Sequence, residues 1–164
     1  MGEKVIMKTI VYNHRSGLNV LPETQLQKVI GVIQQINPRI KQNAVTEIRD
    51  EIIHGLDKEG WSGEYRLDST SKITITSYQN GIGLCIQTGN ISRIYADLLK
   101  LQALFLKGNI RAGIIIVPQR TLAVKLASNM ANYERIIGEM QIFNQVISMP
   151  LVIIGFNEED ARNE

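Results

Sequence analysis

The chain has 164 residues, 44% hydrophobic and 21% charged, a balance typical of one globular domain rather than of a disordered chain. Its net charge of +2 permits nucleic-acid binding without indicating it, since many enzymes are equally basic. The single cysteine, Cys85, excludes an internal disulfide framework and is typical of a reducing compartment. Its apolar runs are too short to cross a bilayer, and the first residues lack the apolar stretch of a signal peptide. We therefore expect a single soluble, cytoplasmic domain over residues 1–164, with no membrane partner.

The first third of the chain predicts one strand followed by two amphipathic helices. Residues 4–12 alternate polar and apolar side chains, as a strand does, whereas residues 22–37 and 43–61 repeat their apolar residues at helical spacing. The two apolar stripes consist of Leu26, Val29, Ile30 and Ile33, and of Val45, Ile48, Ile52 and Leu56. The other face of the second helix carries Glu47, Glu51, His54 and Lys58, which is typical of a solvated surface.

The remaining residues alternate between strand and helix patterns. Strands are predicted over residues 72–78, 81–89, 112–118 and 150–156, and helices over 92–107, 119–127 and 132–143. The strands over 112–118 and 150–156 are apolar throughout, which indicates burial on both faces. This order predicts an α/β fold with a mixed β-sheet flanked by helices.

The two middle strands form a predicted hairpin, because the dipeptide Asn80-Gly81 between them is a strong signal for a two-residue turn. Counting outward from the turn places Ser77 opposite Leu84, Thr76 opposite Cys85, Ile75 opposite Ile86 and Thr74 opposite Gln87. One face of the hairpin then collects Ile73, Ile75, Leu84 and Ile86, which we expect in the core. The other face collects the four residues Thr74, Thr76, Cys85 and Gln87. A polar cluster of this kind in the middle of a sheet is a candidate site.

Residues 74–105, TITSYQNGIGLCIQTGNISRIYADLLKLQALF, resemble the core motif of the BglII/BstYI-type restriction endonucleases of the PD-(D/E)XK superfamily. Further motifs resemble the same family in the same order along the chain: VYNHRSGLNVL, EGW, AGIIIVP, SNMANYE and MPLVIIGF. The resemblance implies a restriction-endonuclease-like fold, double-stranded DNA as partner and Mg²⁺ as the cofactor of an active member. It also implies a homodimer, because the family reads palindromic sites.

The same resemblance places the catalytic Asp of the family at Thr76, its catalytic Glu at Cys85 and its Gln at Gln87. A neutral hydroxyl and a soft thiol are poor ligands for Mg²⁺, so we expect a DNA-binding protein with a degenerate nuclease site and no cofactor. Two alternatives stay open. One is an active Mg²⁺-dependent enzyme in which Glu47, on the second helix, supplies a carboxylate near Gln87. The other is a protein-interaction module on the same fold, in which Cys85 is simply a small buried residue.

Four residues are predicted to contact DNA. Ser128 and Asn129 match the region through which relatives enter the major groove, where short hydroxyl and amide side chains read base edges. Asn90 follows the Gln87 motif at a position that touches DNA in the family. Lys125 is a predicted phosphate contact. Lys72, Arg93 and Arg135 are further candidates for phosphate contacts, although solvation alone explains most exposed cations.

Overall fold

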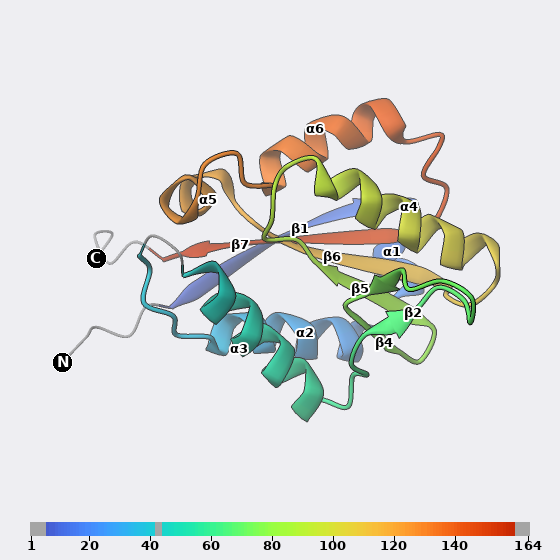
Figure 1. Cartoon of the computed structure of the whole chain (residues 1–164), viewed down its shortest axis with the longest axis horizontal. Coiled ribbons are helices and arrows are strands. Elements are labelled where there is room, and N and C mark those ends of the chain that lie inside the picture. The colour runs from blue at the N-terminus through green and yellow to red at the C-terminus, as the bar shows by residue number, and fades with distance from the viewer. Residues whose placement is uncertain (1–5, 42–43, 160–164) are drawn as a thin grey trace.

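A five-stranded mixed sheet with helices on both faces forms the centre of the computed structural model, which describes residues 6–41 and 44–159 (Figure 1). The elements in chain order are β1 (Met7–His14), α1 (Gly17–Val20), α2 (Glu23–Gln35), α3 (Val45–Lys58), β2 (Tyr65–Arg66), β3 (Thr74–Ile75), β4 (Ser77–Gln79), β5 (Ile82–Ile86), α4 (Arg93–Leu106), β6 (Ala112–Pro118), α5 (Arg120–Leu126), α6 (Tyr133–Phe143) and β7 (Leu151–Glu158). Each predicted helix and strand is present within a few residues of its expected bounds. The short elements α1 and β2 were not predicted.

The sheet has the strand order β1-β7-β6-β5-β4. The pairs β5–β6 and β6–β7 are parallel, whereas β1–β7 and β4–β5 are antiparallel, which confirms the predicted mixed sheet. Both β6 and β7 are buried on both faces, as their continuous apolar sequences predict. In the described part of the chain, no helix combines the length and apolarity needed to cross a bilayer.

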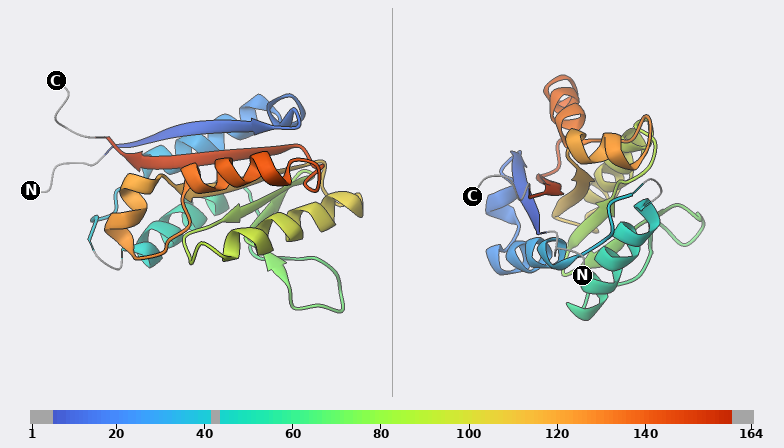
Figure 2. Two further views of the ribbon diagram at one scale, coloured as in Figure 1. Left: turned by 90° about the horizontal axis from the view of Figure 1, so that it is seen from above. Right: turned by 90° about the vertical axis from the view of Figure 1, so that its left-hand side faces the viewer.

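Two apolar clusters fill the space on either side of the sheet. Helices α2 and α3 cover one face and α4 and α6 cover the other, as Figures 1 and 2 show. Along β5 the side chains alternate between these layers, so Leu84 and Ile86 belong to the α2–α3 cluster and Cys85 belongs to the α4–α6 cluster. Strand β5 therefore has no solvated face.

The β4–β5 hairpin has the predicted turn and the predicted register. Asn80 and Gly81 have φ values of 48° and 80°, and both must be positive in the favoured two-residue turn of a hairpin. Tyr78 pairs with Gly83, and the ladder also joins Ser77 to Leu84 and Gln79 to Ile82.

Beyond Ser77 the predicted hairpin ends, and the predicted pairing of residues 74–76 with residues 85–87 is wrong. The chain bends at Thr76, and β3 pairs with β2 instead, with Tyr65 opposite Ile75. The bend breaks the alternation of side chains, since a shift of one residue moves the next side chain to the other face. Ile75 consequently packs in the same cluster as Cys85, and Ile73 is 51% exposed rather than in the core.

Candidate functional site

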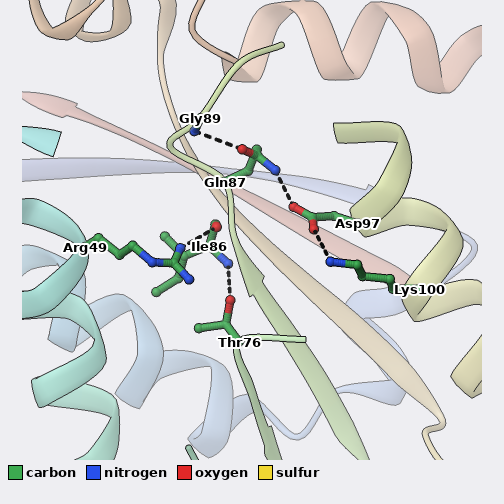
Figure 3. Close-up of polar contacts among 7 residues, drawn as sticks. All are labelled: Arg49, Thr76, Ile86, Gln87, Gly89, Asp97 and Lys100. Carbon is green, nitrogen blue, oxygen red and sulfur yellow. Dashed lines mark hydrogen bonds and ion pairs between the residues drawn. The ribbon is translucent and has the colours of Figure 1, made fainter. Parts of the chain in front are cut away.

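A cleft of about 610 Å³ opens where β5 ends, between α3 and α4 (Figure 3). Helix α3 contributes Arg49 and helix α4 contributes Arg93, Asp97 and Lys100. Gln87, the residue after β5, lies between the two helices. The cleft is therefore lined by polar side chains from segments far apart in the sequence, which is typical of a binding site.

Gln87 is held by two hydrogen bonds. Its Nε2 donates to Asp97 Oδ2 at 2.5 Å, and its Oε1 accepts from the backbone N–H of Gly89 at 2.9 Å. The other oxygen of Asp97, Oδ1, lies 3.9 Å from Lys100 Nζ. Gln87, Asp97 and Lys100 thus form a connected polar chain across one wall of the cleft (Figure 3).

Asp97 is the buried charge of this site, with only 8% of its surface exposed. Burial raises the pKa of its carboxyl above the ordinary value, while the hydrogen bond from Gln87 and the charges of Lys100, Arg49 and Arg93 oppose that shift. Sequence reasoning missed Asp97. The signal was its position on the apolar stripe of α4, three residues after Ile94, where a solvated aspartate is not expected.

The opposite wall of the cleft is built around the peptide groups of Ile86. Thr76 Oγ1 accepts a hydrogen bond from the N–H of Ile86 at 3.1 Å, and Arg49 Nη1 donates to the carbonyl oxygen of Ile86 at 2.9 Å (Figure 3). These side chains satisfy backbone groups that a longer hairpin ladder would have satisfied. The bend at Thr76 therefore brings its hydroxyl to the cleft.

The predicted polar face of the hairpin is only partly assembled. Thr74, Thr76 and Gln87 line the cleft, but Cys85 does not. The Cys85 side chain is 2% exposed and packs in the apolar cluster with Ile94 and Leu98, and burial raises the pKa of its thiol far above the usual range. Cys85 is placed as a small buried core residue.

We expect the Cys85 thiol to be inert toward a chromogenic aromatic disulfide in the folded protein and to react fully after unfolding in urea. The thiolate is the reactive form, and a buried thiol with a raised pKa is neither ionised nor reachable. The measurement is the absorbance of the released thiolate at about pH 8, near the ordinary cysteine pKa. Fast reaction of the native protein would contradict this placement.

Glu47 is exposed and is not among the residues lining the cleft, so the structure does not bring it to Gln87. Arg49 reaches the cleft from α3 instead. The two residues are two positions apart, and side chains at that spacing on a helix point in different directions. Helix α3 therefore directs the cation Arg49 into the cleft, whereas the resemblance allowed the carboxylate of Glu47 there.

The cleft does not match the donor set that Mg²⁺ prefers, which is several oxygen ligands with carboxylates among them. Two carboxylates line it, those of Glu64 and Asp97, and Asp97 is already bound by Gln87 and paired with Lys100. Within residues 6–41 and 44–159, no group of three or more His, Cys, Asp or Glu side chains could hold a metal ion. The residues present do not fit the magnesium ion that the resemblance implies.

Asn90, Ser128 and Asn129 lie on adjacent loops beside the cleft. Asn90 forms a β-bridge with Met130, and the N–H of Ile91 donates to the carbonyl oxygen of Asn129 at 2.9 Å. The Asn90 side chain accepts hydrogen bonds from the backbone and hydroxyl of the next residue but one, at the start of α4. Ser128 and Asn129 are exposed and line a second hollow of about 320 Å³.

The fourth predicted DNA contact, Lys125, lies apart from the other three. It does not line either hollow, and its Nζ is 3.3 Å from Glu158 Oε1 on β7. The second hollow presents two arginines instead, Arg120 and Arg135. Of these two arginines, Arg135 is a candidate phosphate contact from the sequence and Arg120 is not.

A family model described as restriction endonuclease BamHI matches residues 6–164, which is nearly the whole chain. The chain belongs to this family. The type II restriction enzyme BamHI of Bacillus amyloliquefaciens is 32% identical to it over 78 residues, which make up 48% of this chain. The matched segment spans only 35% of the length of that enzyme.

Solved structures of the restriction endonuclease BglII share the fold. The complex of BglII with a DNA 16-mer aligns with a TM-score of 0.80 and 13% identity, covering 90% of this chain and 75% of BglII. Free BglII aligns with a TM-score of 0.75 and 11% identity, covering 93% of this chain and 80% of BglII. The restriction-endonuclease-like fold predicted from the sequence is confirmed.

Proposed function

We propose that this member of the BamHI family binds double-stranded DNA through the cleft and does not hydrolyse it by a magnesium-dependent mechanism. The observation that supports this best is the charge of the cleft, where Arg49, Arg93 and Lys100 surround the buried carboxylate of Asp97. A phosphate group is attracted to such a surface, whereas a divalent cation is not. Double-stranded DNA is the proposed partner because the BglII structure with the same fold was solved with a DNA 16-mer.

The two residues at the catalytic positions implied by the resemblance support the absence of cleavage. Thr76 offers one neutral hydroxyl, and Cys85 is buried in the core rather than directed to the cleft. In a metal-dependent hydrolase the metal activates a water and neutralises charge on the phosphate. Loss of a properly held metal would remove on the order of 4 kcal/mol or more of barrier lowering, about a thousandfold in rate.

We expect the protein to bind a fluorescent DNA duplex with the same affinity in EDTA and in Mg²⁺. The cations of the cleft do not depend on a metal, and they outnumber its two carboxylates, of which Asp97 is already bound by Gln87 and paired with Lys100. Fluorescence anisotropy titrations at several salt concentrations measure this, and affinity should fall steeply with salt because phosphate contacts release counterions. A strict requirement for Mg²⁺ would contradict the proposal. No affinity at any salt concentration would favour a protein-interaction module instead.

Asp97 favours a second candidate function, an active Mg²⁺-dependent endonuclease. It is a buried carboxylate beside Gln87, and it lies on α4 rather than on the hairpin. In that case Asp97 would have to release Gln87 and Lys100, and Glu64, which lines the same cleft, would have to join it in holding the ion. Incubation of plasmid DNA with Mg²⁺ or Mn²⁺ separates the two functions, since discrete fragments that disappear in the Asp97→Asn variant would establish the enzyme.

We also propose that the protein acts as a homodimer through an apolar surface on α4 and α6, which we call the α4–α6 surface. Its members are Tyr95, Leu99 and Leu106 on one side of α4, Ile142 on α6 and Val146 just after α6. Leu99, Leu106, Ile142 and Val146 are 61%, 72%, 75% and 64% exposed. Single exposed apolar residues are ordinary, but several on one face mark an interaction site.

Two features of the α4–α6 surface favour a second copy of the chain as its partner. Arg135 and Glu139 lie on the same side of α6 as Ile142 and form an ion pair at 2.5 Å, so a two-fold copy can place opposite charges against each other. The surface also borders an apolar hollow of about 420 Å³, lined by Leu99, Phe143 and Val146 among others, which the same apolar surface of a second copy can cover.

A further inference from the structure

We propose that Arg49, Arg93 and Lys100 together form a metal-free site for one DNA phosphodiester, in which Asp97 acts as the internal counter-anion of the three side chains. The inference rests on the proposed DNA binding and adds the residues that take over the role of a divalent cation. Those residues come from α3 and α4, outside the hairpin on which the resemblance places the catalytic positions.

The three cations share one cleft. Lys100, Arg49 and Arg93 all line the one cleft that Asp97 also lines, although they come from two different helices. Asp97 already accepts a hydrogen bond from Gln87, so the carboxylate keeps a partner when Lys100 moves away from it. The Lys100 Nζ lies 3.9 Å from Asp97 Oδ1, which is ion-pair distance but too long for a hydrogen bond. Lys100 can therefore turn toward a phosphate without losing a hydrogen bond to Asp97.

Arg49 and Arg93 are each fixed near the cleft by the backbone. Arg49 uses one guanidinium N–H for the carbonyl oxygen of Ile86, which is one of the five donors that the group carries. Arg93 lies over Gly89: a Cβ added there would be 3.1 Å from Arg93 Cδ, closer than such contacts ordinarily are. A side chain at position 89 would require Arg93 to shift, so the glycine allows Arg93 to pack closely against the backbone beside the cleft.

Thr76 adds a neutral donor to this set. Its oxygen accepts from the N–H of Ile86, which leaves its own hydroxyl hydrogen to donate to a phosphate oxygen. One hydroxyl and three cations around a hollow form the kind of donor set that recognises a phosphate diester. Gln87 contributes as a positioning residue, because its two hydrogen bonds hold Asp97 and the Gly89 turn in place.

The test compares four variants of the full chain by anisotropy with a fluorescent duplex in EDTA. Arg93→Gln and Lys100→Gln should each weaken binding about tenfold and reduce the salt slope by about one unit. Lys107→Gln is the matched control: like Lys100 it is paired with an aspartate, at 3.6 Å, but it lies outside the cleft, and it should change neither quantity. Asp97→Asn keeps an oxygen for Gln87 and removes the counter-anion, so binding should tighten about threefold or more.

Thermal unfolding of the same variants with inorganic phosphate supplies a second readout. Phosphate in EDTA should raise the melting temperature of the wild-type protein and should not raise that of Lys100→Gln. If phosphate stabilises the wild type but the duplex does not bind, the anion site stands and the proposed function fails. If Arg93→Gln and Lys100→Gln bind the duplex as the wild type does, DNA binding stands and this site is wrong. Weaker binding by Asp97→Asn would also overturn it.

Discussion

Replacing Cys85 with glutamate lowers the free energy of unfolding by about 3–5 kcal/mol, the cost of an unpaired charge in an apolar interior. Cys85 is 2% exposed and packs among Ile94, Leu98 and Ile115 on the side of the sheet that α4 covers. The glutamate implied by the family resemblance would stand at this position without a solvated face. Restoring that one residue therefore destabilises the folded protein instead of restoring a metal site.

The destabilisation caused by Cys85→Glu should depend on pH in a defined direction. Burial raises the pKa of the new carboxyl in the folded state above its unfolded value of about 4.3. The unfolded state then binds fewer protons, so stability falls as pH rises above that value, and the loss is smallest in acid. Urea denaturation at several pH values measures it. The matched control is Thr76→Asp, which places a carboxyl on the half-exposed cleft wall and should cost far less. Equal losses in the two variants would contradict the buried placement of Cys85.

The hairpin shows how far sequence reasoning reaches in this fold. Asn80-Gly81 fixed the turn, and counting from it gave the correct partners for Ser77, Tyr78 and Gln79. The count failed at Thr76, because alternation assumes an unbroken strand and nothing in TITSY marks the bend. Since β3 pairs with β2, a two-residue strand that the sequence did not reveal, the error follows from a tertiary contact.

The cleft contains some of the residues predicted for the candidate site and others that were not predicted. Gln87 and Thr76 line it, and so do Arg49, Asp97 and Lys100, which were not singled out from the sequence. They lie on α3 and α4, and their approach to Gln87 depends on how the helices pack on the sheet, which periodicity alone does not give. Asp97 alone had a signal in the sequence, although that signal was missed. An aspartate on an apolar stripe indicates a buried polar partner.

Replacing Leu99 with aspartate converts the proposed dimer to monomer and weakens DNA binding. Leu99 is 61% exposed on α4 and borders a hollow of about 420 Å³ lined by apolar residues, including Phe143 and Val146. Within this surface, Tyr95 of α4 and Phe143 of α6 make an edge-to-face contact with their ring centroids 5.9 Å apart. A charge in the centre of such an interface costs about 2–4 kcal/mol per site. A two-fold dimer contains the site twice, so the association constant should fall by several orders of magnitude.

Sedimentation equilibrium of wild type, Leu99→Asp and Ile73→Asp checks this prediction. Ile73 is the matched control, because it is also a large exposed apolar residue, at 51%, but lies outside the α4–α6 surface. Wild type and Ile73→Asp should sediment as dimers, and Leu99→Asp as a folded monomer with unchanged circular dichroism. The monomer keeps one complete cleft, so it should retain weak, salt-dependent DNA affinity while losing the added affinity that two linked clefts give. A monomeric wild type would overturn the proposed interface and leave the single-cleft phosphate site unaffected.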